Sequence, residues 1–193
     1  GISKAFWMSR LLPRSFKSVR KRYMVRPGHY GQATQDQKGQ IEKSVDPDAL
    51  AAIVFTSGST GAPKGVRYLH RTFDTQIQAL KNIFGMKPGE IDLTTLPIFG
   101  LFNPALGITS VLPEINPRKP ASADSEKLVH ALIHHKITTA FASPVIGKKI
   151  VSASKKNGNF FPDIKRFFLA GAPISPGLAE DLQQFLPNGE VIV

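Results

Sequence analysis

The sequence predicts an α/β domain with a mainly parallel sheet and flanking helices, formed by residues 49–193. Two observations lead to this prediction. Short apolar runs alternate along this region with longer stretches in which apolar residues recur at helical intervals. Most of the helix-like stretches stand between strand-like ones, as in βαβ units, whose strands run parallel. The chain has 193 residues, 41% of them hydrophobic, so it can bury a substantial core.

Two strand-like runs and one helix-like stretch open this region. The runs AAIVFT (51–56) and GVRYL (65–69) are rich in aliphatic and aromatic residues, so we expect two buried strands. Residues 70–85 end in glycine, a common residue just past a helix, and place four apolar residues at helical intervals: Phe73, Ile77, Leu80 and Phe84. The run EIDLTTLP (90–97) predicts a strand that ends at Pro97.

The second half of the chain alternates more regularly. Residues 124–136 predict a helix that Asp124 caps and that places three apolar residues on one face, Leu128, Ala131 and Leu132. Two more helices open with Ser-Pro, a favoured start because the first helical residue needs no N–H partner, and they cover residues 143–156 and 175–187. Strands are expected at residues 137–142, 164–171 and 190–193. The last of these is expected to continue in a longer protein.

The net charge of +11 is concentrated at the N-terminus. Residues 1–26 hold 8 of the 25 Lys and Arg residues and none of the 14 acidic ones, so the remainder carries 17 positive and 14 negative charges, a net of +3. We interpret residues 1–48 as a basic arm with a polar connection. Such an arm can contact an anionic membrane or phosphates, or form a solvated helix. We expect a cytoplasmic protein, with peripheral membrane contact left open and nucleic-acid binding disfavoured.

The stretch TSGSTGAPKG (56–65) has the composition of an anion-binding loop. Hydroxyl groups and glycines allow backbone N–H groups to approach a ligand, and Lys64 adds a positive charge, so a polyphosphate is the expected guest. The loop is not G-x-x-x-x-G-K-[ST], because Gly65 follows Lys64. It does not fit G-x-G-x-x-G either.

The longer stretch FTSGSTGAPKGV (55–66) closely resembles the phosphate-binding signature of the adenylate-forming enzymes, which include acyl-CoA synthetases, luciferases and peptide-synthetase adenylation domains. The resemblance implies that ATP is a substrate and that Lys64 is catalytic, stabilising the pyrophosphate leaving group. The residues implied around the polyphosphate are Thr56, Ser57, Gly58, Ser59, Thr60, Gly61 and Lys64.

Two further stretches are similar to this family. FFLAGAPISPGLAEDL (167–182) resembles its strand, turn and helix beside adenine, which implies an adenine wall of Gly171, Ala172 and Pro173. LPIFGLFNPALG (96–107) has Gly100 where many acyl-CoA synthetases have histidine, and looks more like the β-lactone synthetases of bacterial olefin synthesis and related fatty-acyl ligases. By that resemblance the acyl pocket is bordered by Phe99, Gly100, Phe102 and Asn103. The alternative is that these are core and loop residues.

The implied reaction is ATP- and Mg²⁺-dependent activation of a carboxylic acid, a fatty acid by resemblance, followed by thioester formation with coenzyme A. Two alternatives remain: β-lactone formation from a 3-hydroxy fatty acid, and a non-catalytic membrane or nucleic-acid binding module. The family's magnesium-binding segment and its mobile C-terminal domain would follow residue 193, so this piece alone is expected to be inactive and to hold no metal. His134 and His135 are expected at a helix end rather than on a metal, and the chain has no cysteine.

Overall fold

The computed structural model describes residue 11 and residues 45–55, 64–96, 98–116 and 119–193. The chain divides into two units, Gly1–Val45 and Asp46–Val193. Nearly all of the first unit, including the predicted basic arm, lies outside the described residues.

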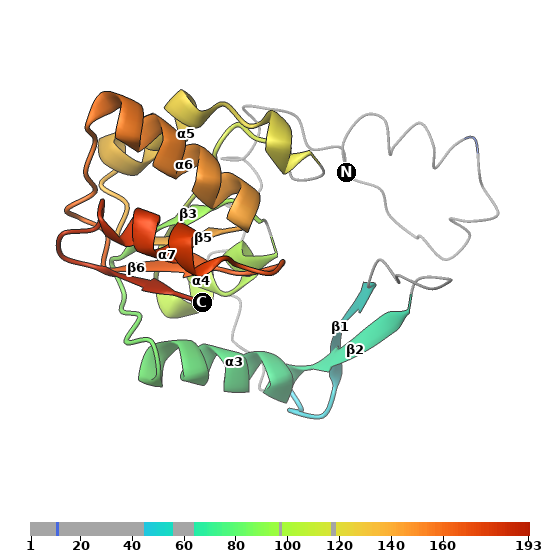
Figure 1. Cartoon of the computed structure of the whole chain (residues 1–193). Coiled ribbons are helices and arrows are strands. Elements are labelled where there is room, and N and C mark those ends of the chain that lie inside the picture. The colour runs from blue at the N-terminus through green and yellow to red at the C-terminus, as the bar shows by residue number, and fades with distance from the viewer. Residues whose placement is uncertain (1–10, 12–44, 56–63, 97, 117–118) are drawn as a thin grey trace. The chain divides into compact units, whose positions relative to one another are not determined.

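A five-stranded parallel sheet forms the centre of this unit, in the strand order β4-β3-β5-β6-β7 (Figure 1). The sheet confirms the predicted α/β class. Each strand has only three or four residues: β3 (Ile91–Thr94), β4 (Thr109–Val111), β5 (Thr139–Ala142), β6 (Arg166–Leu169) and β7 (Glu190–Ile192).

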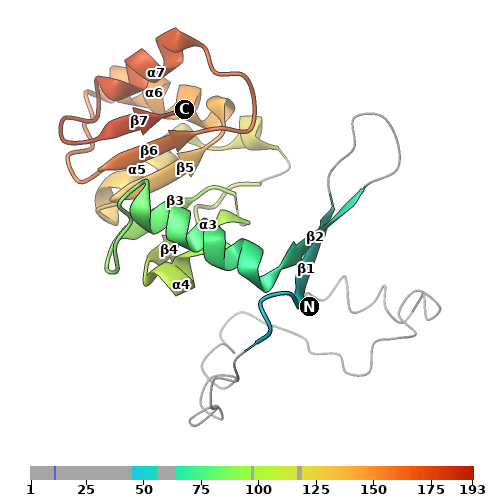
Figure 2. The ribbon, with the colours of Figure 1, turned by 90° about the horizontal axis from the view of Figure 1, so that it is seen from below.

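Three helices cover one face of the sheet (Figures 1 and 2): α5 (Ser125–His134), α6 (Pro144–Asn157) and α7 (Pro176–Gln183). Their apolar sides pack on alternate strand residues such as Leu93, Ala140 and Phe167, which form the main core. Asp124 caps α5 as predicted, accepting hydrogen bonds from the backbone N–H groups of Glu126 and Lys127. Each Ser-Pro pair also starts a helix as predicted, with Pro144 and Pro176 as first helical residues.

The opposite face carries α3 (His70–Asn82) and the short α4 (Asn103–Leu106) (Figure 2). A smaller core lies here, built from Met86, Leu106 and Ile108 with α3 side chains around them. Successive side chains of a strand point to opposite faces of the sheet, so the strand residues that do not face the main core lie on this face. They are Asp92 and Thr94 in β3, Thr139 and Phe141 in β5, and Arg166 and Phe168 in β6.

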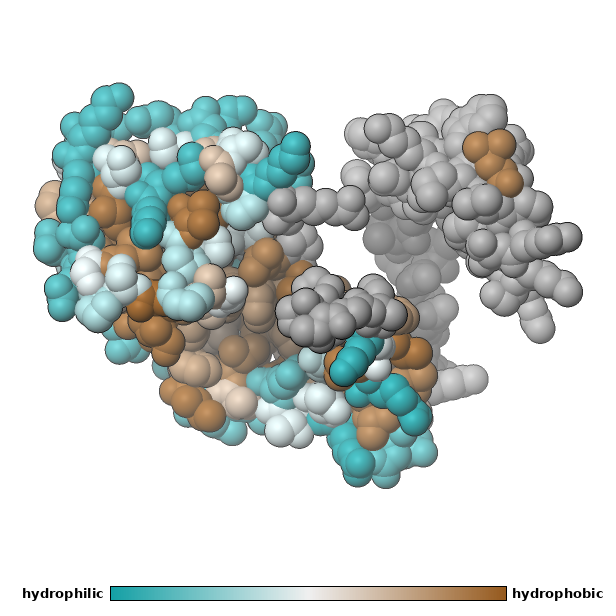
Figure 3. Space-filling view, turned by 45° about the vertical axis from the view of Figure 1, so that its right-hand side comes forward, coloured by the Kyte–Doolittle hydropathy of each residue, from teal (hydrophilic) through white to brown (hydrophobic). Residues whose placement is uncertain are grey.

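The two remaining strands are β1 (Leu50–Phe55) and β2 (Gly65–Leu69), which pair antiparallel in a sheet of their own. The prediction that both are buried is wrong, because Ile53 is 51% exposed, Phe55 68% and Val66 43%. Brown apolar surface is visible on this part of the unit (Figure 3). Apolar composition signals a strand, but it does not specify which surface will cover it.

Several short elements were not predicted from the sequence. Between β3 and α5 the described residues form two single-turn 3₁₀ helices, Phe99–Leu101 and Pro120–Ser122, besides α4 and β4. Two predicted helices end early, α3 at Asn82 and α7 at Gln183. Within the described residues, no helix is both long and apolar enough to cross a membrane.

Candidate active site

The predicted adenine wall forms an exposed turn at the carboxyl end of β6. Ala170, just before it, donates a backbone hydrogen bond of 3.1 Å to the carbonyl oxygen of Ala142 and so holds the turn against β5. Gly171 has a φ of +93°, which favours glycine, and no heavy atom lies within 4 Å of the position its Cβ would take. Gly171, Ala172 and Pro173 are all exposed, so this turn is accessible to a ligand.

The predicted phosphate loop joins the two strands of the hairpin. Thr56–Gly61 lie outside the described residues, whereas Lys64 is exposed and directly precedes β2. The pair Phe55–Gly65 closes the loop. The strand before the loop, β1, belongs to the antiparallel hairpin and not to the parallel sheet.

An apolar cavity of about 210 Å³ lies between α3 and the face of β3, β5 and β6. Five phenylalanines dominate its wall. Phe99 stacks on Phe141 with ring centroids 3.8 Å apart, and Phe84 meets Phe168 edge to face at 5.1 Å. The full lining is Leu80, Phe84, Met86, Asp92, Phe99, Phe102, Asn103, Thr139, Phe141 and Phe168.

Three of the four residues predicted to border an acyl pocket, Phe99, Phe102 and Asn103, line this cavity. Gly100 does not line it. A Cβ at Gly100 would lie 3.2 Å from Cγ2 of Thr94, so a larger residue would press against β3. Sequence reasoning missed Phe141 and Phe168, although both are aromatic and occupy matching positions in the neighbouring strands β5 and β6.

The polar part of the lining is a buried cluster on β3 and α4. Asp92, only 4% exposed, accepts hydrogen bonds at the same oxygen, Oδ2, from the hydroxyl of Thr94 (2.5 Å) and from Nδ2 of Asn103 (2.9 Å). Asn103 also donates to Oγ of Ser110 on β4, at 2.8 Å. Burial raises the pKa of Asp92, and the two hydrogen bonds oppose this rise without cancelling it. Asn103 was predicted from the sequence, whereas Asp92 was not.

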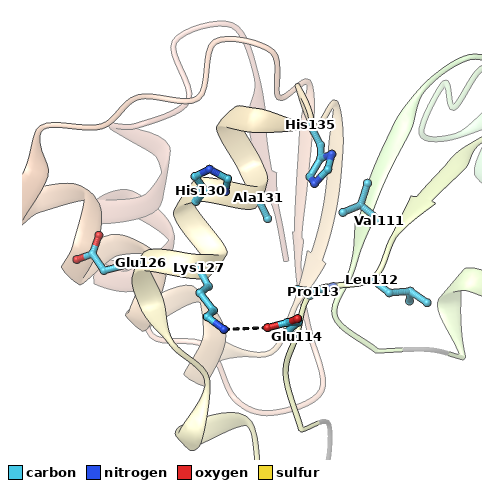
Figure 4. Close-up of a pocket in the computed structure, with 9 residues that line it drawn as sticks. All are labelled: Val111, Leu112, Pro113, Glu114, Glu126, Lys127, His130, Ala131 and His135. Atoms are coloured by element: carbon cyan, nitrogen blue, oxygen red, sulfur yellow. Dashed lines mark hydrogen bonds and ion pairs between the residues drawn. The ribbon is translucent and has the colours of Figure 1, made fainter. Parts of the chain in front are cut away.

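A second cavity, of about 470 Å³, lies where the chain leaves β4 and passes α5 (Figure 4). Lys127 forms a 2.8 Å ion pair with Glu114 there, and this contact lowers the pKa of the Glu114 carboxyl and raises that of the Lys127 ammonium. The strand order separates β4 from β6, whose end carries Gly171, by β3 and β5. This cavity is therefore remote from the predicted adenine wall.

The described histidines, which exclude His29, show no metal-binding arrangement. His134 ends α5 and His135 follows it, and both are exposed, as expected. Over the ranges that the structure describes, no three or more His, Asp or Glu side chains gather so that they could hold a metal ion. The described residues thus offer no magnesium site of their own.

The sequence was matched to a family model and to relatives of known name. Residues 13–193 match the family model "AMP-binding enzyme". The chain is 44% identical over 149 residues to an olefin β-lactone synthetase of Stenotrophomonas maltophilia, which covers 77% of this chain and 26% of the relative. It is 45% identical over 140 residues to an olefin β-lactone synthetase of Xanthomonas campestris, and this match covers 72% of this chain and 24% of the relative.

Solved structures share the fold. A nonribosomal peptide synthetase, FmoA3, in its AMPPNP-bound form aligns with a TM-score of 0.68 and 18% identity over 96% of this chain and 21% of that one. The chain spans about a quarter of the length of the curated relatives named above. Because the family model covers nearly all of the sequence, the chain belongs to the AMP-binding enzyme family.

Proposed function

We propose that the full-length protein uses ATP to convert a carboxylic acid, a fatty acid in the first instance, into an acyl-adenylate with release of pyrophosphate. The observation that carries this proposal is the position of the apolar cavity. Its aromatic wall includes Phe141 and Phe168, at the carboxyl halves of β5 and β6, and the open Gly171 turn follows β6 directly. An acyl chain and a nucleotide would thus meet at the carboxyl edge of the sheet, where open α/β sheets bind ligands.

Each group has a separate role in this proposal. The backbone of Gly171–Pro173 packs against adenine, and the rings of Phe99 and Phe141 exclude water from the acyl chain. Lys64 and the loop before it hold the β- and γ-phosphates, where charge accumulates as the carboxylate oxygen attacks the α-phosphorus and pyrophosphate leaves. Magnesium, when bound, would neutralise phosphate charge.

Two fates of the adenylate are open, and the relatives favour one of them. Coenzyme A can displace AMP to give a thioester. In the alternative, the 3-hydroxyl oxygen of the acid attacks its own activated carbonyl, the bond to AMP breaks, the hydroxyl proton passes to solvent and a β-lactone forms. Identities of 44% and 45% to proteins named olefin β-lactone synthetase support the lactone outcome.

The test uses the full-length protein with ATP, Mg²⁺ and either a fatty acid or its 3-hydroxy analogue, with and without coenzyme A. Exchange of labelled pyrophosphate into ATP reports adenylation, and mass spectrometry identifies the product. A dehydrated product formed from the hydroxy acid without coenzyme A would establish the lactone. A thioester that requires coenzyme A would establish the ligase. No acid-dependent exchange with any acid would refute the adenylation itself.

The charge of residues 1–26 supports a second, compatible proposal, peripheral contact of a cytoplasmic protein with an anionic membrane. The test is binding to phosphatidylserine vesicles with and without residues 1–26. Binding that persists at physiological salt and requires these residues supports the contact. Binding that disappears at modest salt reduces it to nonspecific attraction.

A further inference from the structure

Asp92 stands out in the cavity because it is a buried acidic group that the adenylation mechanism does not use. The hydrogen bonds from Thr94 and Asn103 both end on its Oδ2. No described residue hydrogen-bonds to the other carboxyl oxygen, Oδ1, although Asp92 lines the cavity. One carboxyl oxygen is thus fixed by protein donors, while the other has capacity for a ligand.

The apolar surroundings of Asp92 would make the cavity selective for a ligand that carries a hydrogen-bond donor. Apart from Asp92, Asn103 and Thr139, the cavity lining consists of apolar or aromatic side chains. The amide of Asn103 is already engaged with Asp92 and Ser110. A hydrogen-bond donor on an acyl chain would therefore find an acceptor at Asp92, whereas a plain hydrocarbon chain would cover this carboxyl oxygen and leave it without a partner, which is unfavourable.

Strand register gives the depth of Asp92 below the carboxyl edge. Asp92 is paired with Thr139, and Thr139 with Arg166, so the three residues lie at one level of the sheet. The strand from Arg166 to Leu169 spans about 10 Å at the usual rise per residue, and Gly171 lies in the turn beyond it. If the reacting carboxyl lies near the Gly171 turn, a 3-hydroxyl stays close to that turn, and only a distant part of the chain reaches Asp92.

We propose that Asp92, oriented by Thr94 and Asn103, is a specificity-determining residue that accepts a hydrogen bond from a hydroxyl group on the distal part of the acyl chain. The substrate class would then be fatty acids hydroxylated far from the carboxyl group, whether or not they also carry a 3-hydroxyl. This inference rests on the proposed adenylation and adds the recognition of the chain to it. The position of the cavity supports acyl binding, and the open acceptor on Asp92 supports the hydroxyl.

The experiment measures acid-dependent pyrophosphate exchange by the full-length protein with a ladder of linear acids from hexanoate to tetradecanoate. Each acid is compared with its ω-hydroxy and 3-hydroxy counterparts. We expect one chain length at which the ω-hydroxy acid has a kcat/KM about tenfold or more above that of the plain acid, because a site with an unpaired acceptor disfavours a ligand that lacks the donor. No ω-hydroxy preference at any length overturns the proposal.

Asp92→Leu gives an apolar side chain branched at the same carbon. We expect this variant to lose the ω-hydroxy preference and to use the plain acid of that length better than the wild type does. Ser110→Ala is the matched control, because it removes one hydrogen bond from Asn103 without changing a cavity residue. Equal loss of preference in Ser110→Ala would assign Asp92 a purely structural role and overturn the proposal.

Asp92→Asn keeps the test decisive if the leucine variant does not fold. Its side-chain oxygen can still accept from Thr94 and Asn103, while its amide presents N–H donors to the cavity. We expect it to accept ω-methoxy acids, which offer only an acceptor and which the wild type should discriminate against. A 3-hydroxy preference that depends on Asp92 would overturn the distal placement. Absent exchange with all acids would instead refute the proposed adenylation.

Discussion

Phe99 lies on Phe141 with ring centroids 3.8 Å apart and an angle of 28° between the ring planes. The two residues come from different elements, since Phe99 starts the 3₁₀ helix after β3 and Phe141 is in β5. The stack therefore fixes the irregular segment after β3 against the parallel sheet. It also forms the part of the cavity wall that adjoins the carboxyl edge, so it links the fold directly to the candidate acyl site.

Phe99→Ala should impair the use of linear acids by the full-length protein. Removing the ring takes away acyl contacts worth about 1–3 kcal/mol, so we expect kcat/KM for a linear fatty acid to fall roughly 10- to 100-fold. Bulkier branched acids should lose less because the cavity is wider. Phe160→Ala is the control: Phe160 pairs with Phe185 at 5.9 Å and does not line the cavity. An equal fall in both variants would remove Phe99 from the acyl site.

Gly171→Ala should weaken ATP binding more than it weakens the fold. A Cβ would strain the backbone at φ +93° by roughly 1 kcal/mol and would project beside the surface proposed for adenine. Gly158→Ala is a matched control, because Gly158 also has a positive φ, +66°, with no atom within 4 Å, but stands at the end of α6. We expect both variants to lose similar stability in urea unfolding and only Gly171→Ala to raise the KM for ATP. A KM unchanged in both would place the nucleotide elsewhere.

Lys64→Ala should slow adenylation far more than it weakens binding of the acid. The proposed role of Lys64 is to stabilise charge on the departing pyrophosphate, so its loss is expected to reduce the adenylation rate by about 100-fold or more. Lys87→Ala removes another exposed lysine, located after α3, and should leave the rate unchanged. Pre-steady-state measurement of pyrophosphate release, together with acid binding by calorimetry, separates the two effects. Unchanged adenylation in Lys64→Ala would rule out its catalytic role.

The helices of the main core could be predicted because their signals are local. Asp124 and the Ser-Pro pairs at 143–144 and 175–176 set helix starts through neighbouring backbone groups alone. The turn at Gly171 was predicted only through the family resemblance, because the local pattern extended the strand to residue 171, whereas β6 ends at Leu169.

The hairpin and the cavity depend on residues far apart in the sequence. Nothing within AAIVF distinguishes a strand of the parallel sheet from a strand of a separate antiparallel pair, so the burial of Ile53 and Phe55 was predicted wrongly. The cavity needs Phe84, Phe141 and Phe168 on three elements to converge. Asp92 was missed because one acidic residue in a strand carries no local sign of the partners that Asn103 supplies from α4.

The Asp92 carboxyl should make stability depend on pH in a predictable direction. Burial raises its pKa in the folded state above the value of about 3.9 expected in the unfolded chain. The folded protein therefore holds this proton more tightly, so the stabilising contribution is fully present below the unfolded pKa and is lost as the pH rises through the folded pKa. Asp92→Asn does not titrate and keeps both acceptor contacts.

We therefore expect the free energy of unfolding of the wild type, relative to Asp92→Asn, to decrease as the pH is raised from about 4 towards neutrality. Urea unfolding of the two full-length proteins at a series of pH values measures this difference. A wild type that gains stability relative to the asparagine variant over the same rise would show that the hydrogen bonds from Thr94 and Asn103 outweigh burial.

Arg166→Met should be among the most destabilising single changes at the face that carries the cavity. Arg166 and Glu90 are 8% and 4% exposed and form an ion pair, and Nζ of Lys165 lies 3.5 Å from the other carboxyl oxygen of Glu90. Methionine would leave the Glu90 charge buried with only the exposed Lys165 beside it, so we expect a loss of about 3–5 kcal/mol in urea unfolding. Adding Glu90→Gln should recover a large part of this loss, because the uncompensated charge is then gone.

Lys155→Met, which breaks the surface pair with Asp181, is the control and should cost less than about 1 kcal/mol. If the Arg166 and Glu90 substitutions proved additive in a double-mutant cycle, the two side chains would not be coupled, and the buried ion pair would not account for the loss of stability.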